Sequence, residues 1–234
     1  MKYRVLILGD GKLATELHRQ TDWNYISRKK DDINFFYPQT YENFIVSDEY
    51  DQILNCIGYT KTYENERQLN WNANYVGVIN LVNMCNKYNK KIIHISTDYI
   101  YANTAENSSE DDIPVHFKSW YSYTKLLADG YVQAMARDYL LLRTTFKPRP
   151  FPWKTAWNDI VGNFDYVDVI AKLITKLIEK NSQGVYNVGT ESKTYYDLAI
   201  QTVPDCVKDD TNAFNHPKNV TMNLSKLNNK LNEI

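Results

Sequence analysis

The segment YRVLILGDGKLA, residues 3–14, passes from a short apolar run directly into a turn that contains two glycines. Beyond the turn, Leu13, Ala14 and Leu17 recur at helical spacing. A strand, a tight turn and a helix in this order open a dinucleotide-binding βαβ unit, here with the turn spelled G-x-G-x-x-A. The segment predicts an α/β fold of the Rossmann type: a doubly wound, mostly parallel sheet with helices on both faces.

The glycine turn has the chemistry that a pyrophosphate requires. Gly9 permits the tight turn, Gly11 lets the backbone approach the phosphates, and Ala14 keeps the helix close to the strand. The helix N-terminus attracts the negative charge. An ordinary loop is the alternative interpretation of the glycines taken alone. We expect cofactor contacts from Gly9, Asp10, Gly11, Lys12 and Leu13.

Basic residues follow the second predicted strand, residues 23–27. An acidic residue at this strand end would bind the ribose 2′-hydroxyl of NAD, whereas a basic pair suits the extra phosphate of NADP. Arg28 and Lys29 therefore favour NADPH as the cofactor, with NADH possible. The alternative is a solvated, charged loop.

A second pair of segments carries candidate reaction chemistry. HISTDY, residues 94–99, reads as a buried strand that ends in hydroxyls and an acid. Tyr121 and Lys125 lie four residues apart on a predicted helix, and therefore on one face of it. A phenol near an amine and a hydroxyl can donate a proton to a carbonyl. The free phenol has a pKa of about 10, and we expect the Lys125 charge to lower it. A surface Tyr/Lys pair is the alternative.

Strand and helix signals alternate along the rest of the chain. On the helix predicted for residues 68–88, the expected buried face consists of Trp71, Tyr75, Val78, Ile79, Val82 and Cys85. Residues 147–153 contain alternate prolines and cannot be helical. The remaining expected elements are strands at residues 49–58, 91–95, 140–145 and 184–189 and a helix at 169–178.

Composition narrows the functional classes. A chain of 234 residues that is 43% hydrophobic can fill one domain, or one domain and a small lobe. The net charge of −1 does not suggest a nucleic-acid or membrane surface, and no apolar run could span a bilayer. The start of the chain leads into a strand, unlike a signal peptide. The three cysteines and four histidines lack metal-ligand spacing. We therefore expect no metal, no nucleic-acid or membrane partner, and a cytoplasmic location.

Tyr-x-x-x-Lys with an upstream Ser/Thr resembles the short-chain dehydrogenase/reductase superfamily. STDYIY at residues 96–101, EDDIP at 110–114 and YSYTKLLAD at 121–129 are similar to its dTDP-4-dehydrorhamnose reductase branch. One departure concerns the glycine turn. The family spacing G-x-x-G-x-x-G would place glycines at Leu8, Gly11 and Ala14, so the turn is expected to differ locally while still binding pyrophosphate.

The resemblance implies a role for each candidate catalytic residue. Thr97 would hydrogen-bond the substrate carbonyl, and Tyr121 would donate the proton. Lys125 would hold the nicotinamide ribose and tune Tyr121, and Asn74 would hold Lys125 through a water. Since asparagine is unfavourable inside a helix, a tertiary role for Asn74 is reasonable, with a surface asparagine as the alternative.

The resemblance also assigns binding residues. Asp32 would contact the adenine, and the strand end Ile57, Gly58 and Tyr59 would lie beside the cofactor, although Tyr59 could equally be a core aromatic. Residues 102–118 would form a loop over the site. The expected substrate contacts are Ser96, Asp98 and Tyr99. Trp153 is a further candidate because an aromatic ring beside the site could stack on a sugar or base, and the alternative is that it fills the core of the small lobe.

The resemblance extends over nearly the whole chain, with an abridged substrate lobe. Residues 1–145 and about 164–188 would form the Rossmann domain, and residues 146–163 and 189–234 the small C-terminal substrate lobe. A homodimer through the helices of Asn74 and Tyr121 is also implied.

The expected function is NADPH-dependent reduction of a nucleotide-linked 4-keto-6-deoxy sugar, a nucleotide-sugar substrate. One alternative is a nucleotide-sugar epimerase or dehydratase, although dehydratase relatives carry a Glu after the Thr-Asp pair where this chain has Tyr99. The other is a non-catalytic, NADP-binding regulatory subunit, which the abridged lobe favours and the intact Thr97, Tyr121 and Lys125 set opposes.

Overall fold

A computed structural model describes residues 3–101, 107–111, 119–211 and 216–233. A six-stranded sheet in the order β10-β5-β4-β3-β1-β2 lies at its centre, and every pair of neighbouring strands in it is parallel. The predicted doubly wound α/β fold is therefore confirmed. The strands of this sheet are β1 (Val5–Leu8), β2 (Tyr25–Ile26), β3 (Gln52–Asn55), β4 (Lys91–Ser96), β5 (Tyr139–Arg143) and β10 (Gly184–Asn187).

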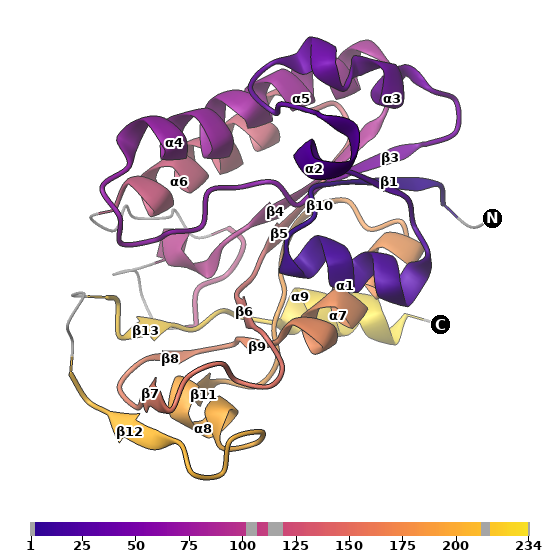
Figure 1. Ribbon diagram of the computed structural model, residues 1–234. Coiled ribbons are helices and arrows are strands. Elements are labelled where there is room, and N and C mark those ends of the chain that lie inside the picture. Colours follow the sequence, from indigo (N-terminus) through magenta and orange to yellow (C-terminus); the bar gives the residue numbers. More distant parts are fainter. Residues whose placement is uncertain (1–2, 102–106, 112–118, 212–215, 234) are drawn as a thin grey trace.

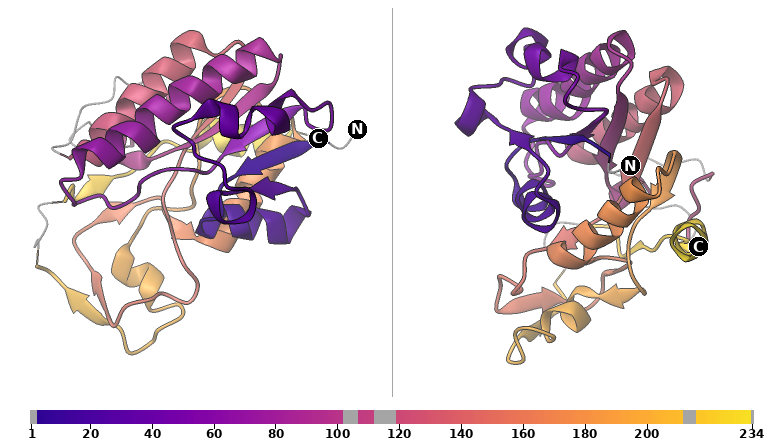
Figure 2. Two further views of the ribbon diagram at one scale, coloured as in Figure 1. Left: turned by 45° about the horizontal axis from the view of Figure 1, so that its top comes forward. Right: turned by 90° about the vertical axis from the view of Figure 1, so that its right-hand side faces the viewer.

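Helices cover both faces of the sheet (Figures 1 and 2). The α-helices are α1 (Lys12–Thr21), α2 (Arg28–Asp31), α3 (Glu42–Val46), α4 (Arg67–Trp71), α5 (Gly77–Lys87), α6 (Trp120–Met135), α7 (Val167–Glu179), α8 (Tyr195–Ala199) and α9 (Ser225–Asn232). Shorter turns of other helix types are η1 (Pro38–Thr40), η2 (Asn72–Val76) and η3 (Asp98–Tyr101).

The alternation of side chains along the strands explains the two layers of the core. Val5 and Ile7 of β1 pack with α1, α7 and α9 on one face. Leu6 and Leu8 pack with α3, α5 and α6 on the other. All four side chains are at most 2% exposed. Each contributes on the order of 2 kcal/mol by leaving water, so both faces of the sheet stabilise the fold.

The predicted helix at residues 68–88 has an unexpected middle. It is formed by α4, a π-helical turn at η2, and α5. A π-turn inserts extra backbone and rotates the side chains that precede it relative to those that follow. Val78, Val82 and Cys85 are buried as predicted, but Trp71 is 37% exposed, so its place on the buried face was wrong. Asn70 and Asn74 point inward instead.

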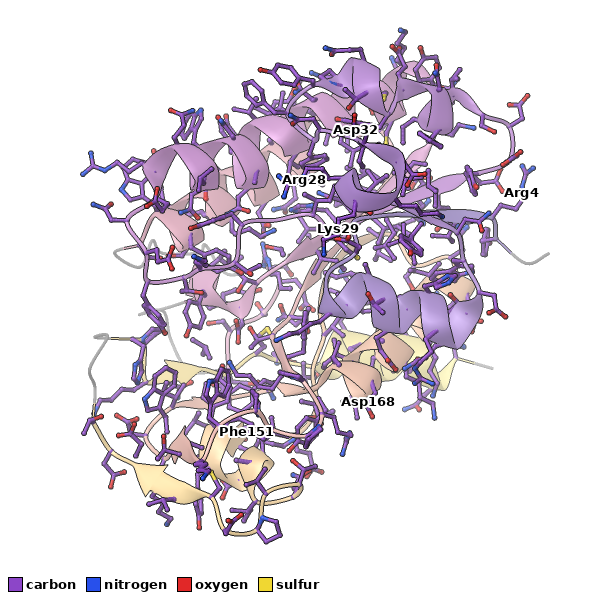
Figure 3. The ribbon with its side chains drawn as sticks, in the orientation of Figure 1. Arg4, Arg28, Lys29, Asp32, Phe151 and Asp168 are labelled. Atoms are coloured by element: carbon purple, nitrogen blue, oxygen red, sulfur yellow. The ribbon has the colours of Figure 1, made fainter. Side chains whose placement is uncertain are left out.

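A second, smaller core lies beyond the sheet, where Phe151, Phe164, Tyr166, Tyr195 and Leu198 pack together. Phe151 lies within this part of the molecule in Figure 3. As predicted, residues 147–153 are not helical. The short strands here are β6 (Phe146–Lys147), β7 (Thr155–Trp157), β8 (Val161–Gly162), β9 (Asp165–Tyr166), β11 (Lys193–Thr194), β12 (Val207–Asp209) and β13 (Asn219–Val220).

The last helix belongs to the packing of the sheet. Leu227 of α9 is buried in the same cluster as Ile174 of α7 and Tyr186 of β10. The division into residues 1–145 with 164–188, and 146–163 with 189–234, is a proposal, in which α9 is best counted with the sheet. None of the helices in the described ranges has the length and apolar character that a membrane span requires.

Candidate active site

The carboxyl ends of the parallel strands meet at one edge of the sheet, beside the point between β1 and β3 where the strand order reverses. A cleft of about 510 Å³ lies at this edge. It brings together many residues that the sequence singled out. Those lining it are Gly11, Lys12, Leu13, Ile57, Gly58, Asn74, Ser96, Thr97, Tyr99, Tyr121, Lys125 and Trp153.

Other predicted residues do not belong to the described wall of the cleft. They are Gly9, Asp10, Arg28, Lys29, Asp32, Tyr59 and Asp98. Asp98 is fully buried, whereas Asp32 is an exposed residue with a left-handed backbone at the end of α2. Residues 102–106 and 112–118 of the predicted loop over the site lie outside the described residues.

The glycine turn has the predicted form. Gly9 has a φ of 112°, a conformation that side chains disfavour, and a Cβ there would lie 3.2 Å from Ile57 Cγ1. Gly11 is the N-cap of α1, with open space where a Cβ would stand. No described side chain caps α1, and its first turn has no acidic residue. Its N–H groups can therefore receive an anion.

Arg28 and Lys29 stand on α2, directly after β2 and its N-cap Ser27. Both side chains are exposed, and neither has an ion-pair partner among the described residues. In Figure 3, Arg28 is labelled beside α2, and Lys29 is labelled between α2 and α1. Since β1 and β2 are neighbouring parallel strands, the basic pair follows the same edge of the sheet as the glycine turn.

Tyr121 lies in the first turn of α6, whose N-cap Ser119 accepts a hydrogen bond from Ser122 N–H at 3.1 Å. Thr97 follows β4 and lines the same cleft as Tyr121, so hydroxyl and phenol share this space. The ring of Tyr99 meets that of Tyr121 edge-on, with 6.4 Å between centroids. The predicted constellation of strand-end hydroxyl, phenol and lysine is thus assembled.

Lys125 does not activate Tyr121 as expected. Burial raises the pKa of Tyr121 to about 12, and burial lowers the pKa of Lys125 to about 8. The Lys125 Nζ donates to the carbonyl oxygen of Ile95 at 2.6 Å. The predicted lowering of the phenol pKa was wrong for the ligand-free protein, because desolvation is the largest influence on the pKa of Tyr121 and raises it.

Asn74 has the tertiary role that its place inside a helix suggested, in a specific form. Its Oδ1 accepts a hydrogen bond from Tyr59 N–H at 2.8 Å, and its Nδ2 donates to Tyr59 O at 3.0 Å. A Cβ on Gly58 would lie 3.2 Å from the same Oδ1. The amide therefore clamps the turn after β3 against η2 and shapes this wall of the cleft.

Asp98 is buried beneath the cleft. Its Oδ1 accepts hydrogen bonds from Thr97 Oγ1 at 3.2 Å and from Thr145 Oγ1. Oδ2 has no hydrogen-bond partner in the described structure. Burial raises the pKa of this carboxyl to about 6.

The raised pKa makes Asp98 a pH-dependent cost to stability. The folded state binds the proton more tightly, so the contribution of this carboxyl is most favourable below pH 4 and is lost as the pH rises to about 6. We expect Asp98→Asn to stabilise the protein by on the order of 2–3 kcal/mol more at about pH 8 than at about pH 4. Urea unfolding at both pH values measures the change in the free energy of unfolding, with the exposed Asp205→Asn as the control. An equal change for Asp98→Asn at the two pH values would contradict the prediction.

Sequence reasoning missed Lys147 and Tyr195, which also line the cleft. The Lys147 Nζ lies 4.3 Å from the ring centroid of Tyr195 and 5.7 Å from that of Trp153. Burial lowers the pKa of Lys147 to about 8. A lysine directly after a strand-end Thr-Thr-Phe was a usable signal for Lys147. Tyr195 had none, since it arrives from a distant segment.

A second hollow of about 510 Å³ continues from the cleft toward the smaller core. Tyr99, Lys147, Trp153 and Tyr195 line both spaces. The second hollow adds Tyr63, Phe151, Thr155, Ala156, Trp157 and Asp209. The combined space has an aromatic wall, and the half-buried Lys147 lies where the two hollows meet.

The sequence of this chain is similar to those of known proteins. Residues 3–146 match the family described as the RmlD substrate binding domain. The chain is similar to dTDP-4-dehydrorhamnose reductase of Mycolicibacterium smegmatis, with 31% identity over 102 residues, 41% of this chain and 30% of that protein. It is also similar to the Bacillus subtilis spore coat polysaccharide biosynthesis protein SpsK, with 23% identity over 149 residues, 61% of this chain and 53% of that protein. The matches thus span only 30% and 53% of the length of these two relatives.

Among solved structures, the dTDP-4-dehydrorhamnose reductase of Bacillus anthracis in complex with NADP superposes with a TM-score of 0.84. The two sequences are 21% identical, and the match covers 97% of this chain and 92% of the other. A likeness at this identity shows the fold.

Proposed function

This chain belongs to the family of the RmlD substrate binding domain, and we propose that it is an NADPH-dependent reductase of a nucleotide-linked 4-keto-6-deoxy sugar. The observation that carries the proposal is that Thr97, Tyr121 and Lys125 line one cleft. The glycine turn lines the same cleft at Gly11, where no atom lies close to the position of a Cβ. The geometry supports both halves of the reaction, cofactor binding and proton supply.

The residues at the strand ends fit a dinucleotide. Gly9, Gly11 and the uncapped start of α1 would hold the pyrophosphate, and Arg28 with Lys29 would hold a 2′-phosphate. When bound, NADPH would supply the hydride for the carbonyl carbon.

Proton supply would come from this chain. Tyr121 would give its phenolic proton to the carbonyl oxygen, oriented by a hydrogen bond from Thr97. A phenol with a pKa near 12 is a weak acid, but the oxygen that it protonates becomes a far stronger base as the reduction proceeds. General acid catalysis of this kind contributes about 10²–10⁴-fold.

The aromatic wall suits the remainder of the substrate. Trp153 and Tyr195 offer flat apolar surfaces for a sugar or a base, and Lys147 offers a positive charge for a diphosphate. Lys147 lies where both hollows meet, so a nucleotide sugar could extend from Tyr121 into the second hollow.

A homodimer through α4, α5 and α6 is also proposed. The exposed apolar side chains Leu69 and Trp71 on α4 support it. The three cysteines are free, which supports a reducing compartment such as the cytoplasm.

The experiment that tests the function is NADPH oxidation with a panel of nucleotide-linked 4-keto-6-deoxy sugars. Turnover with at least one of them is the expected result and would name the substrate class. NADPH binding without turnover on the whole panel would contradict the reductase and favour the non-catalytic subunit.

The basic pair on α2 should decide the choice of cofactor. We expect Arg28→Ala combined with Lys29→Ala to weaken NADPH binding by about 10–100-fold, because two charge-assisted contacts to the 2′-phosphate would be lost. NADH binding should change by less than about 2-fold, since NADH has no such phosphate. Calorimetric titration measures both affinities, with exposed Arg19→Ala as the matched control. An equal loss for both cofactors would show that α2 does not select NADPH.

A further inference from the structure

A row of buried hydrogen bonds runs behind the cleft and ends at Lys125. Ile57 N–H donates to Asn55 Oδ1 at 3.0 Å. Asn55 Nδ2 lies 3.1 Å from His94 Nδ1, and His94 Nε2 lies 3.3 Å from Lys125 Nζ. Asn55 and His94 are both 0% exposed. The proposed reduction uses neither residue, so their burial beside a cleft lysine requires another explanation.

The hydrogen bond from Ile57 N–H to Asn55 determines which atom donates and which accepts in the rest of this row. Because Asn55 Oδ1 accepts from a backbone N–H, the amide nitrogen must face His94, and an amide nitrogen only donates. His94 Nδ1 must therefore accept. Burial lowers the pKa of His94 well below its ordinary value, so the ring is neutral and carries one proton. That proton must be on Nε2.

The Nε2–H group points at Lys125 Nζ, and only one form of the lysine can accept it. An ammonium has three donors and no lone pair, whereas a neutral amine has a lone pair and two remaining donors. One of those donors is used at Ile95 O, 2.6 Å away. We propose that Asn55 and His94 are positioning residues that favour the neutral amine form of Lys125 in the ligand-free protein, with Nζ accepting from His94 and donating to Ile95.

The charges around Lys125 are compatible with this arrangement. Burial raises the pKa of Cys56 and of Tyr121 to about 12, so both groups are neutral. Asp129 on α6 favours the ammonium, but it is paired with Arg143 of β5 at 3.1 Å. Burial also favours the neutral amine of Lys125, the form that can accept a hydrogen bond from His94, because burial lowers the pKa of the amine to about 8.

The test is a nuclear magnetic resonance titration of the whole ligand-free chain. Nitrogen-15 shifts of the imidazole identify the His94 tautomer, and carbon-13 at Cε of lysine reports the ionisation of Lys125, assigned by its loss in Lys125→Arg. We expect the Nε2–H tautomer and a Lys125 midpoint at least about 2 units below the ordinary value of about 10.4. An Nδ1–H tautomer, or a midpoint near the ordinary value, would overturn the proposal.

A variant that exchanges donors and acceptors along this row of hydrogen bonds provides a second measurement. In Asn55→Asp, both carboxylate oxygens accept, so His94 should carry its proton on Nδ1 and present a lone pair to Lys125. The Lys125 midpoint should then rise by more than about 1 unit, a tenfold or larger change in the ionisation constant. His18→Gln, on α1, should leave both signals unchanged. A variant with an unchanged tautomer and midpoint would contradict the proposal. If Asn55→Asp fails to fold, the wild-type titration alone decides.

This assignment does not depend on the proposed reductase, because it concerns the ligand-free chain. Its consequence for turnover does rest on that function. The same variant should move the pH midpoint of kcat/KM that depends on Lys125, whereas simple loss of structure would lower the rate equally at every pH.

Discussion

Tyr121→Phe is expected to lower kcat for sugar reduction by about 10²–10⁴-fold, the largest effect on activity of any single substitution considered for this protein. The variant removes only the phenolic oxygen. The ring can still pack edge-on against Tyr99, so the shape of the cleft should persist. NADPH affinity should change by less than about 2-fold, because the glycine turn and α2 are untouched.

Steady-state kinetics with the substrate found in the panel, and calorimetry with NADPH, check this prediction. Tyr131→Phe is the matched control on the same helix, because its hydroxyl bonds Asn83 at the surface, at 3.0 Å. The control should retain full turnover. A Tyr121→Phe variant with more than about a tenth of wild-type kcat would show that another group supplies the proton.

Asp129→Asn should produce the largest loss of stability, about 3–5 kcal/mol in the free energy of unfolding. Asp129 on α6 pairs with Arg143 on β5, and their side chains are 1% and 2% exposed. Removing the carboxylate charge leaves the guanidinium buried without a counter-charge. Arg143 also donates to Tyr101, a neutral partner that cannot replace the lost charge.

An exposed pair provides the comparison for this prediction. Arg4 and Asp51 are separated by 2.6 Å, but their side chains are 56% and 47% exposed, and Arg4 lies at the edge of the molecule in Figure 3. Asp51→Asn should therefore cost less than about 1 kcal/mol, because water screens the pair. Urea unfolding of both variants measures the contrast. Similar costs for the two would show that Arg143 finds other compensation.

The fold was largely predictable because its signals are local. The apolar run before Gly9 predicted β1, and the helical spacing of Leu13 and Leu17 predicted α1, both of which the structure contains. Where a local signal was interrupted, prediction failed. The π-turn at η2 changes the phase of the helix, so Trp71 is exposed instead of buried.

The candidate site was predictable in part. Tyr121 and Lys125 were proposed from their spacing and Thr97 from the family resemblance, and the structure brings all three to the same cleft. Lys147 and Tyr195 were missed, although they line it too. Lys147 follows a strand end and could have been found there, whereas Tyr195 reaches the cleft from the smaller core, whose packing depends on contacts between distant segments.

By itself, the sequence determined the order of strands and helices and the placement of reactive groups at strand ends, because apolar periodicity and glycine conformation act over a few residues. Only the tertiary structure decided which distant side chains share the cleft and what charge they carry. The pKa of Lys125 falls and that of Tyr121 rises because both groups lose water to neighbours from other elements. Desolvation depends on every surrounding segment, and no local pattern contains that information.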